Sequence, residues 1–232
     1  MSNLQKTGGY SAIAFAILLV IGLILIIPPF TTMSPDAADP ANFAARLAFA
    51  AALSQMQRLT LAVGFALEVG APVAIFPAVL ALYLRATSQQ KEQALLAGGL
   101  MTLAIPFFIT EHLPRFSLLI LSADFSRLSA IDQAGRAGAY AYAEGLSINA
   151  EIVFWLFFTC AAIAYLPIMR GSGFGRWLPW LGVFTGAIGL ITNVGTYFAA
   201  ALGAASVLAL LLLIVVFFGL GVSLVRAKGS QP

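Results

Sequence analysis

The chain has 232 residues and a formal net charge of +3; 61% of its residues are hydrophobic and only 9% are charged. With a mean hydropathy of +0.97, it has too few polar residues to cover a soluble domain, so that class is excluded. The composition indicates an integral membrane protein. We expect the lipid bilayer to be its main partner, and we expect no nucleic acid partner.

A helix needs about 20 apolar residues to cross a bilayer. Five segments meet or approach this length, at about residues 10–27, 59–84, 148–169, 177–200 and 203–225. Another segment starts near Ala94 and stays apolar as far as Ile109, which is slightly short. It is long enough if the helix continues through the following polar residues to Leu121, so we predict a third span at about 94–121. The sequence therefore predicts an all-α, polytopic membrane helix bundle of six transmembrane helices, forming a single domain over residues 1–232.

The first apolar segment has some features of a secretion signal, because Lys6 precedes it. Its apolar run is longer than the usual h-region of a signal, and it ends in "IIPPFTTM" without a clear small-x-small cleavage site. We therefore interpret it as a permanent span.

Positively charged loops are retained on the cytoplasmic side of a membrane. With six spans, one face of the bundle carries a single acid, Glu92, against the basic residues Lys6, Arg85, Lys91, Arg170, Arg176, Arg226 and Lys228. The other face carries five arginines against eight acids. Both termini are therefore predicted to be cytoplasmic. The alanine richness and the excess of arginine over lysine indicate a GC-rich bacterial genome, so the predicted location is a bacterial plasma (inner) membrane.

Two outer loops are too long to be simple turns. The first, at about 39–58, has an N-cap pattern in Asp39 followed by Pro40, and apolar residues at helical spacing: Phe43, Leu47, Ala50 and Leu53. We expect an amphipathic helix there, which either lies on the outer surface or continues into the second span. The second loop, at about 123–146, alternates charges with alanine, and we expect one or two short helices that cap the bundle.

Ionisable residues inside a membrane cost several kcal/mol, so they indicate function by default. Four predicted spans place such residues, or an asparagine, in their outer halves: Glu68 in the second, Glu111, His112 and Arg115 in the third, Glu151 in the fourth and Asn193 in the fifth. At a rise of 1.5 Å per residue, Glu68 lies roughly 13 Å, and Asn193 about 10 Å, from the outer end of its span. The inner half has almost none, so a polar chamber that opens outward is predicted.

Arg115 is the only cation that this predicted chamber offers to balance Glu68, Glu111 and Glu151. Glu111 precedes Arg115 by four residues, which is the favourable order for an ion pair along a helix. Pro114 removes a backbone hydrogen bond and is expected to kink the helix. Three carboxylates against one guanidinium imply that at least one acid is protonated or shared at neutral pH, because burial and like charge both favour the neutral form.

Two functions are compatible with such a chamber. It binds a small molecule, an ion or a proton, for transport or sensing, or the chain is an accessory subunit of a membrane complex whose buried charges only fix helix packing. No metal site is expected, because the chain has one histidine and no H-x-x-x-H or E-x-x-H spacing. A two-histidine haem site is excluded by the same count, and no cofactor is expected. No catalytic motif is present, so enzymatic activity is not predicted.

Residues 162–191, "AIAYLPIMRGSGFGRWLPWLGVFTGAIGLI", form a distinctive stretch. An apolar helix ends in a Tyr-Leu pair, and a short basic Gly/Ser loop is followed by Arg-Trp-Leu, a Leu-Gly pair and a glycine-rich helix. This stretch resembles the uncharacterised prokaryotic multi-pass membrane family called domain of unknown function 4386. The resemblance extends to six spans, a long first outer loop, and a third span with an arginine and a glutamate, and it implies no particular activity. In that family the arginine precedes the glutamate and a proline precedes the tryptophan, whereas here Glu111 precedes Arg115 and Gly175-Arg176 precede Trp177.

Overall fold

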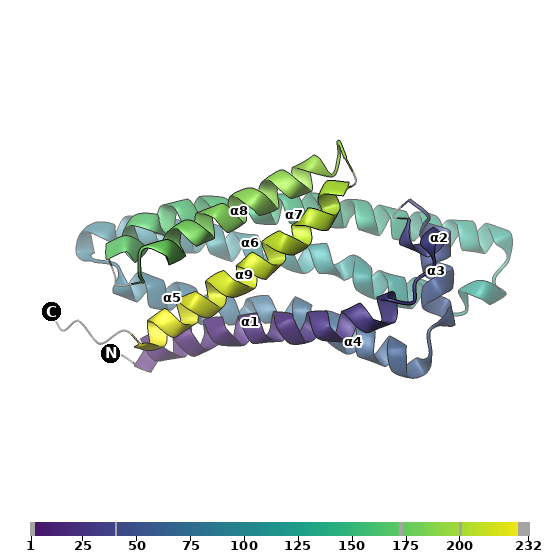
Figure 1. Ribbon diagram of the computed structural model, residues 1–232, viewed down its shortest axis with the longest axis horizontal. Coiled ribbons are helices and arrows are strands. Elements are labelled where there is room, and N and C mark those ends of the chain that lie inside the picture. The colour runs from purple at the N-terminus through teal and green to yellow at the C-terminus, as the bar shows by residue number, and fades with distance from the viewer. Residues whose placement is uncertain (1–2, 40, 172–173, 200, 227–232) are drawn as a thin grey trace.

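The computed structural model describes residues 3–39, 41–171, 174–199 and 201–226, and every regular element within these ranges is a helix. Six helical segments are long and apolar enough to cross a membrane. They form an elongated bundle in which α1 begins and α9 ends at the same end (Figure 1). We call this the termini end, and the opposite end, covered by the short helix α3, the α3 end. The predicted all-α bundle with six membrane-spanning helices is confirmed.

The spans lie close to the predicted ranges. They are formed by α1 (Asn3–Phe30), α4 (Gln55–Gly70) with the 3₁₀ turn η1 (Ala71–Ala74) and α5 (Ile75–Arg85), α6 (Lys91–Leu121), α7 (Ala130–Gly171), α8 (Trp177–Gly195) and α9 (Ala201–Arg226). The second span is divided because Pro72 occupies the first turn of η1 and has no N–H to donate. Lys228 and Pro40 lie outside the described residues.

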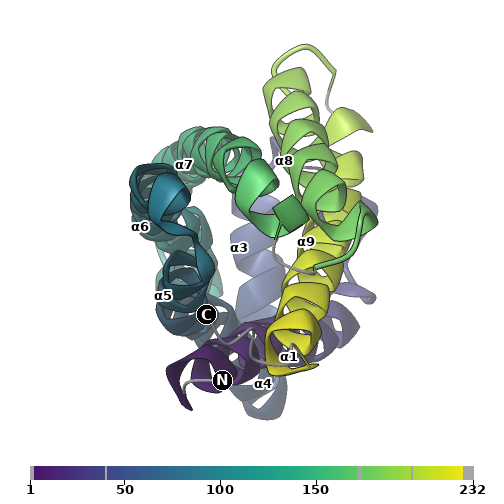
Figure 2. The same ribbon diagram turned by 90° about the vertical axis from the view of Figure 1, so that its left-hand side faces the viewer.

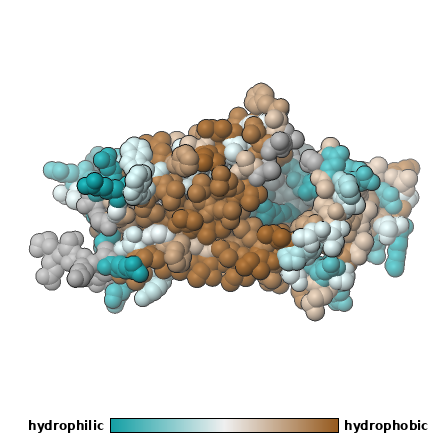
Figure 3. Space-filling view, in the orientation of Figure 1, coloured by the Kyte–Doolittle hydropathy of each residue, from teal (hydrophilic) through white to brown (hydrophobic). Residues whose placement is uncertain are grey.

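The spans are arranged as a closed ring. Each contacts the next, in the order α1, α4 with α5, α6, α7, α8 and α9, and α9 returns to contact α1. Figure 2 shows this ring from the termini end. On the face shown in Figure 3, hydrophobic residues form a broad belt across the middle of the molecule, with hydrophilic residues toward both ends. Such a belt is what a bilayer requires of the helices that cross it.

Phenylalanine rings from different helices fill the centre of the ring. Phe15 of α1 lies 4.5 Å from Phe217 of α9 and 6.3 Å from Phe108 of α6, measured between ring centroids. Phe154 of α7 lies 5.0 Å from Phe108. Because these side chains are buried, they form an apolar layer that separates the two ends of the bundle.

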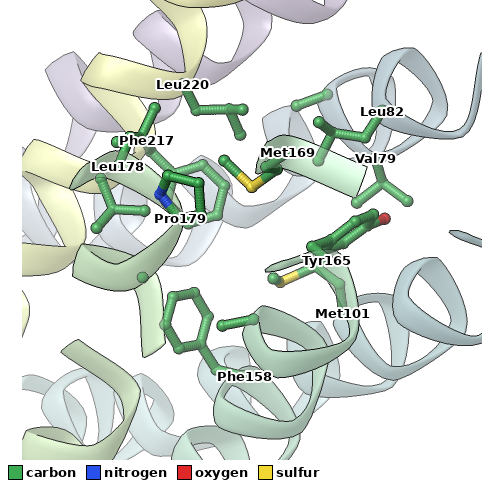
Figure 4. A pocket seen from close by; sticks show the side chains of 14 residues that line it. Val79, Leu82, Met101, Phe158, Tyr165, Met169, Leu178, Pro179, Phe217 and Leu220 are labelled. Carbon is green, nitrogen blue, oxygen red and sulfur yellow. The ribbon is translucent and has the colours of Figure 1, made fainter. Parts of the chain in front are cut away.

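The termini end contains an apolar pocket of about 40 Å³ between α5, α6, α7, α8 and α9. Met101, Phe158, Tyr165, Pro179 and Leu220 are among the side chains around it (Figure 4). Its volume is close to that of a single water molecule, which occupies about 30 Å³ in the liquid. We interpret this pocket as a packing void, and the side chains that line it are all uncharged.

The prediction that residues 123–146 form a separate outer loop with one or two short capping helices is wrong. Residues 130–146 belong to α7, which runs without a break from Ala130 into the membrane span. Ser129 caps its start, because the Ser129 hydroxyl oxygen accepts a hydrogen bond of 3.2 Å from the Asp132 N–H. No proline interrupts the alanine-rich stretch that follows, so nothing ends the helix at the membrane surface.

The helix expected within the first predicted outer loop, 39–58, is present as α3, but its predicted N-cap and its alternative continuation into the second span are wrong. The segment contains α2 (Pro35–Ala38), capped by Ser34, and α3 (Phe43–Ala52), capped by Asn42 rather than by Asp39. A capping box formed by Ser54 and Gln57 then starts α4 as a new helix. The apolar face of α3 packs onto the bundle, where its buried side chains cluster with Leu118, Phe125 and Tyr140 at the α3 end of α6 and α7.

Candidate functional site

A polar cavity of about 280 Å³ lies at the α3 end, on the far side of the phenylalanine layer from the apolar pocket. Side chains from α1, α3, α4, α6 and α7 line it. Its charged lining residues are Arg46, Glu111, Arg115, Glu144 and Glu151. Three of the residues predicted from the sequence, Glu111, Arg115 and Glu151, therefore face one cavity.

Glu68 and His112 lie beneath this cavity, behind Arg115. Their side chains are 0% and 1% exposed, whereas that of Arg115 is 34% exposed. The Arg115 guanidinium donates a hydrogen bond to Oε2 of Glu68, across the interface of α6 and α4. Arg115 therefore links the buried acid to the cavity.

The predicted helical ion pair between Glu111 and Arg115 is wrong. Among the ion pairs of the described residues, Arg115 has Glu68 as its partner, 47 positions away in the sequence. Attraction between charges strengthens as water is excluded, and the Glu68 carboxylate is more buried than that of Glu111. A tertiary partner thus replaces the neighbour on the same helix.

A second arginine, Arg46, reaches the cavity from α3, so the prediction that Arg115 is the only cation there is wrong. Nη2 of Arg46 lies 3.5 Å from Oε1 of Glu144 on α7. The Arg46 guanidinium also lies 5.3 Å from the centre of the Tyr140 ring, and the Tyr140 hydroxyl donates a hydrogen bond to Glu144. These residues lie in the two segments that the sequence predicts to be long outer loops, 39–58 and 123–146. The sequence offers one signal for them, the four-residue spacing of Tyr140 and Glu144, which places the two side chains on one face of a helix.

Glu111 and Glu151 are the two carboxylates of the cavity that form no ion pair with an arginine or lysine of the described part. Oε1 of Glu111 lies 3.8 Å from Nδ1 of His112, but that nitrogen lies 2.8 Å from the Phe108 carbonyl oxygen. Oε1 of Glu151 accepts a long hydrogen bond of 3.4 Å from the Trp155 indole N–H. The cavity therefore holds two carboxylates without a cationic partner.

Asn193 lies at the edge of the site and does not line the cavity. Its side-chain amide donates a hydrogen bond of 2.9 Å to the Gly189 carbonyl oxygen, and it is close enough to Glu151 to interact with that carboxylate. The prediction that Asn193 is well inside its span is wrong, because α8 ends at Gly195 rather than near residue 200. The chain turns directly afterwards, where the Thr196 N–H bonds to the carbonyl oxygens of Thr192 and Asn193.

Ser147 of α7 joins the site to the backbone of α6. Its hydroxyl donates a hydrogen bond of 2.6 Å to the carbonyl oxygen of Glu111. α6 continues as a helix through Pro114, which cannot donate to the preceding turn. The contact from Ser147 therefore ties α7 to α6 in the turn that carries Glu111, Pro114 and Arg115.

α8 packs closely on α7 at Trp155, the residue whose indole N–H bonds to Glu151 one turn away on α7. A Cβ atom built on Gly189 would lie 2.2 Å from the Trp155 ring, so the two helices meet where glycine leaves room for the indole.

Among the described residues, no group of three or more His, Cys, Asp or Glu side chains is arranged to hold a metal ion.

Gly189→Ala is expected to destabilise the protein by about 1–3 kcal/mol, because the added methyl group overlaps the Trp155 ring and forces the helices apart. Thermal unfolding in detergent measures this effect. Gly99→Ala in α6 is the matched control, since a Cβ atom there meets nothing within 4 Å and alanine favours a helix. Equal stability of the two variants would contradict the packing seen between α7 and α8.

Comparisons with known proteins gave no match: no protein-family model, no curated protein and no solved structure matches this chain. They do not test the resemblance of residues 162–191 to the multi-pass family, which stays a prediction.

Proposed function

We propose that this protein is a multi-pass protein of a bacterial plasma membrane that binds a small cation in the polar cavity, for transport or sensing. In this proposal both termini are cytoplasmic and the cavity opens to the outside. The asymmetry of basic residues between the two faces supports this orientation. The start of α1 and the end of α9 lie at the same end of the bundle, which agrees with this orientation.

The charge balance of the site is the observation that carries the proposal. Four carboxylates gather at the α3 end, those of Glu68, Glu111, Glu144 and Glu151, against two guanidinium groups. Each guanidinium is already paired, Arg115 with Glu68 and Arg46 with Glu144. A cation that enters the cavity therefore finds two carboxylates available, whereas an anion finds no unpaired arginine. Carboxylates held in a cavity of low dielectric attract a cation more strongly than they would in water.

The size and lining of the cavity favour a small organic cation. A volume of about 280 Å³ corresponds to roughly nine water molecules at about 30 Å³ each. Phe30, Phe65 and Tyr140 contribute aromatic rings to its walls. The faces of such rings attract ammonium groups, and they do so most strongly for cations that are weakly hydrated.

Binding can be tested with choline, using its neutral isostere 3,3-dimethylbutan-1-ol as the matched ligand. We expect choline to bind the purified protein in detergent at neutral pH, and the isostere to bind much more weakly, as measured by isothermal titration calorimetry. Replacing Glu111 and Glu151 together with glutamine should remove at least about 2 kcal/mol of binding energy, roughly a thirtyfold rise in Kd.

Glu92→Gln is the control variant, because Glu92 is exposed at the start of α6, at the termini end. Its affinity for choline should equal that of the wild type. Equal binding of choline and its isostere, or choline binding that survives the loss of both carboxylates, would overturn the proposal. In that event the charges at the α3 end hold helices together, as expected of an accessory subunit of a membrane complex.

A further inference from the structure

Glu68 and His112 form a buried pair that the cation site does not use. His112 is the single histidine of the chain, and both side chains are shielded from solvent. α1 covers the pair on one side, since a Cβ atom built on Gly22 would lie 2.8 Å from Cγ of Glu68 and 3.1 Å from the Gly64 carbonyl oxygen. The backbones of α1 and α4 therefore approach closely at this point and close the site on that side.

The hydrogen bonds of His112 determine which of its nitrogen atoms carries a proton. Nδ1 lies 2.8 Å from the Phe108 carbonyl oxygen, which can only accept, so Nδ1 must donate. In a neutral imidazole, Nε2 then carries a lone pair. Nε2 faces Oε2 of Glu68 at 3.6 Å, and neither Nε2 nor Oε1 of Glu68 has a hydrogen-bond partner among the residues that the structure describes.

Two buried acceptors that face each other are unfavourable: Nε2 has lost its hydrogen bonds to water and gained none, and Oε2 of Glu68 accepts from Arg115 but gains nothing from Nε2. One added proton changes this contact. Carried by Nε2 or by the Glu68 carboxyl group, it gives the pair a donor and an acceptor. The geometry therefore suits the binding of a single proton.

The charged groups around the pair determine what such a proton does. Arg115 of α6 shares Oε2 of Glu68, and Glu111 of α6 and Glu151 of α7 interact electrostatically with Arg115. α1 brings no titratable side chain here, because its described ones, Lys6 and Tyr10, lie near its start at the termini end. A proton on the pair cancels the negative charge of Glu68 to which Arg115 is bound. The carboxylates of Glu111 and Glu151 then become the strongest partners of Arg115.

We propose that Glu68 and His112 bind one proton, and that this proton releases Arg115 toward Glu111 and Glu151 and so expels the cation from the cavity. The coupling rests on the proposed cation site, whereas the proton site does not. The exchange is balanced, since one proton taken from water replaces one monovalent cation and the net charge of the site is unchanged. Only bonds to hydrogen form or break.

The proton site can be tested without a cation, by ¹⁵N NMR of the imidazole in the wild-type protein in detergent. His112 is expected to give one set of signals in which Nδ1 is protonated at every pH, while the Nε2 signal changes between pH 4.5 and 9. A constant Nε2 signal over this range, or a spectrum with Nδ1 unprotonated, would overturn the proton site, and this measurement needs no variant.

The variant Glu68→Gln tests whether the change of the Nε2 signal with pH depends on the Glu68 carboxylate. The glutamine amide can donate to Nε2, so the neutral imidazole is satisfied and the change with pH should disappear. Glu92→Gln is the control and should behave as the wild type. If the Nε2 signal of His112 in Glu68→Gln still changes with the same pH midpoint as in the wild type, the Glu68 carboxylate takes no part in proton binding.

The coupling is tested by the Kd of choline as a function of pH. Below the midpoint of the His112 signal, Kd should rise about tenfold for each pH unit, because one proton competes with one cation. In Glu68→Gln this slope should be absent. A Kd independent of pH, beside a titrating His112, would overturn the coupling alone. Failure of choline to bind at any pH would overturn the proposed cation site and the coupling, and would leave the proton site to be judged by the NMR result.

Discussion

Arg115→Ala is expected to lower the free energy of unfolding by about 3 kcal/mol or more. The change leaves the Glu68 carboxylate in a fully buried position without the guanidinium that compensates its charge, and loss of one partner of a buried pair is strongly destabilising. Unfolding by SDS or urea in mixed micelles, followed by circular dichroism, measures the effect.

The exposed ion pair between Arg127 and Asp124 provides the control for this prediction. Its atoms lie 3.6 Å apart, and its side chains are 84% and 73% exposed. Arg127→Ala should therefore change stability by less than about 1 kcal/mol. Adding Glu68→Gln to Arg115→Ala should restore part of the lost stability, since no buried charge then remains. If Arg115→Ala costs no more than Arg127→Ala, the pair with Glu68 does not stabilise the bundle.

Arg58→Ala is expected to destabilise the α3 end by about 3 kcal/mol. Arg58 stands in the first turn of α4, and its guanidinium donates hydrogen bonds of 3.0 Å to the Ala50 carbonyl oxygen and 2.6 Å to that of Leu119. A further hydrogen bond of 3.2 Å reaches the Ser122 hydroxyl. These acceptors lie near the C-terminal ends of α3 and α6, where carbonyl oxygens have no partner within their own helix. Removing the guanidinium takes this donor from the Ala50 carbonyl oxygen and leaves the Leu119 carbonyl oxygen with the 3.1 Å hydrogen bond from the Ser122 hydroxyl. Each hydrogen bond to a charged group contributes about 1.5–3 kcal/mol.

Hydrogen exchange followed by mass spectrometry locates this effect. In Arg58→Ala, exchange should rise in α3 and in the last turn of α6 and stay unchanged at the termini end. Arg58→Lys keeps the positive charge but has no fork of donors, so it should restore only part of the protection. Full protection in Arg58→Lys would mean that charge, and not the three hydrogen bonds, holds the helix ends.

The spans could be predicted because hydropathy and length are properties of each segment by itself. A helix that crosses a bilayer must satisfy its own backbone and present apolar side chains, and this requirement is visible in the sequence of every span. The elements outside the membrane were predicted less well. Charges between 123 and 146 suggested a loop with short helices, but α7 continues through this stretch because a helix has no reason to end where the membrane ends.

The members of the candidate site could be predicted in part for the same reason. An acid or a basic residue within an apolar span is conspicuous, and its depth follows from the helical rise, which led to Glu68, Glu111, Arg115 and Glu151. Their partners could not be predicted, because a pair between helices depends on how each helix is rotated about its axis. Arg46 was missed because it lies outside the predicted spans, where a charged residue is ordinary.

The sequence by itself therefore determined the membrane class, the six spans and the depth at which ionisable side chains occur. Only the tertiary structure decided that Arg115 pairs with Glu68 instead of Glu111, that α3 brings Arg46 to the cavity, and that Glu111 and Glu151 are left without a cationic partner. The physical reason is the range of the interactions. Hydropathy acts on each segment alone, whereas a buried charge takes the partner that packing places beside it, and here that packing depends on the close approach of α1 and α4 at Gly22 and Gly64.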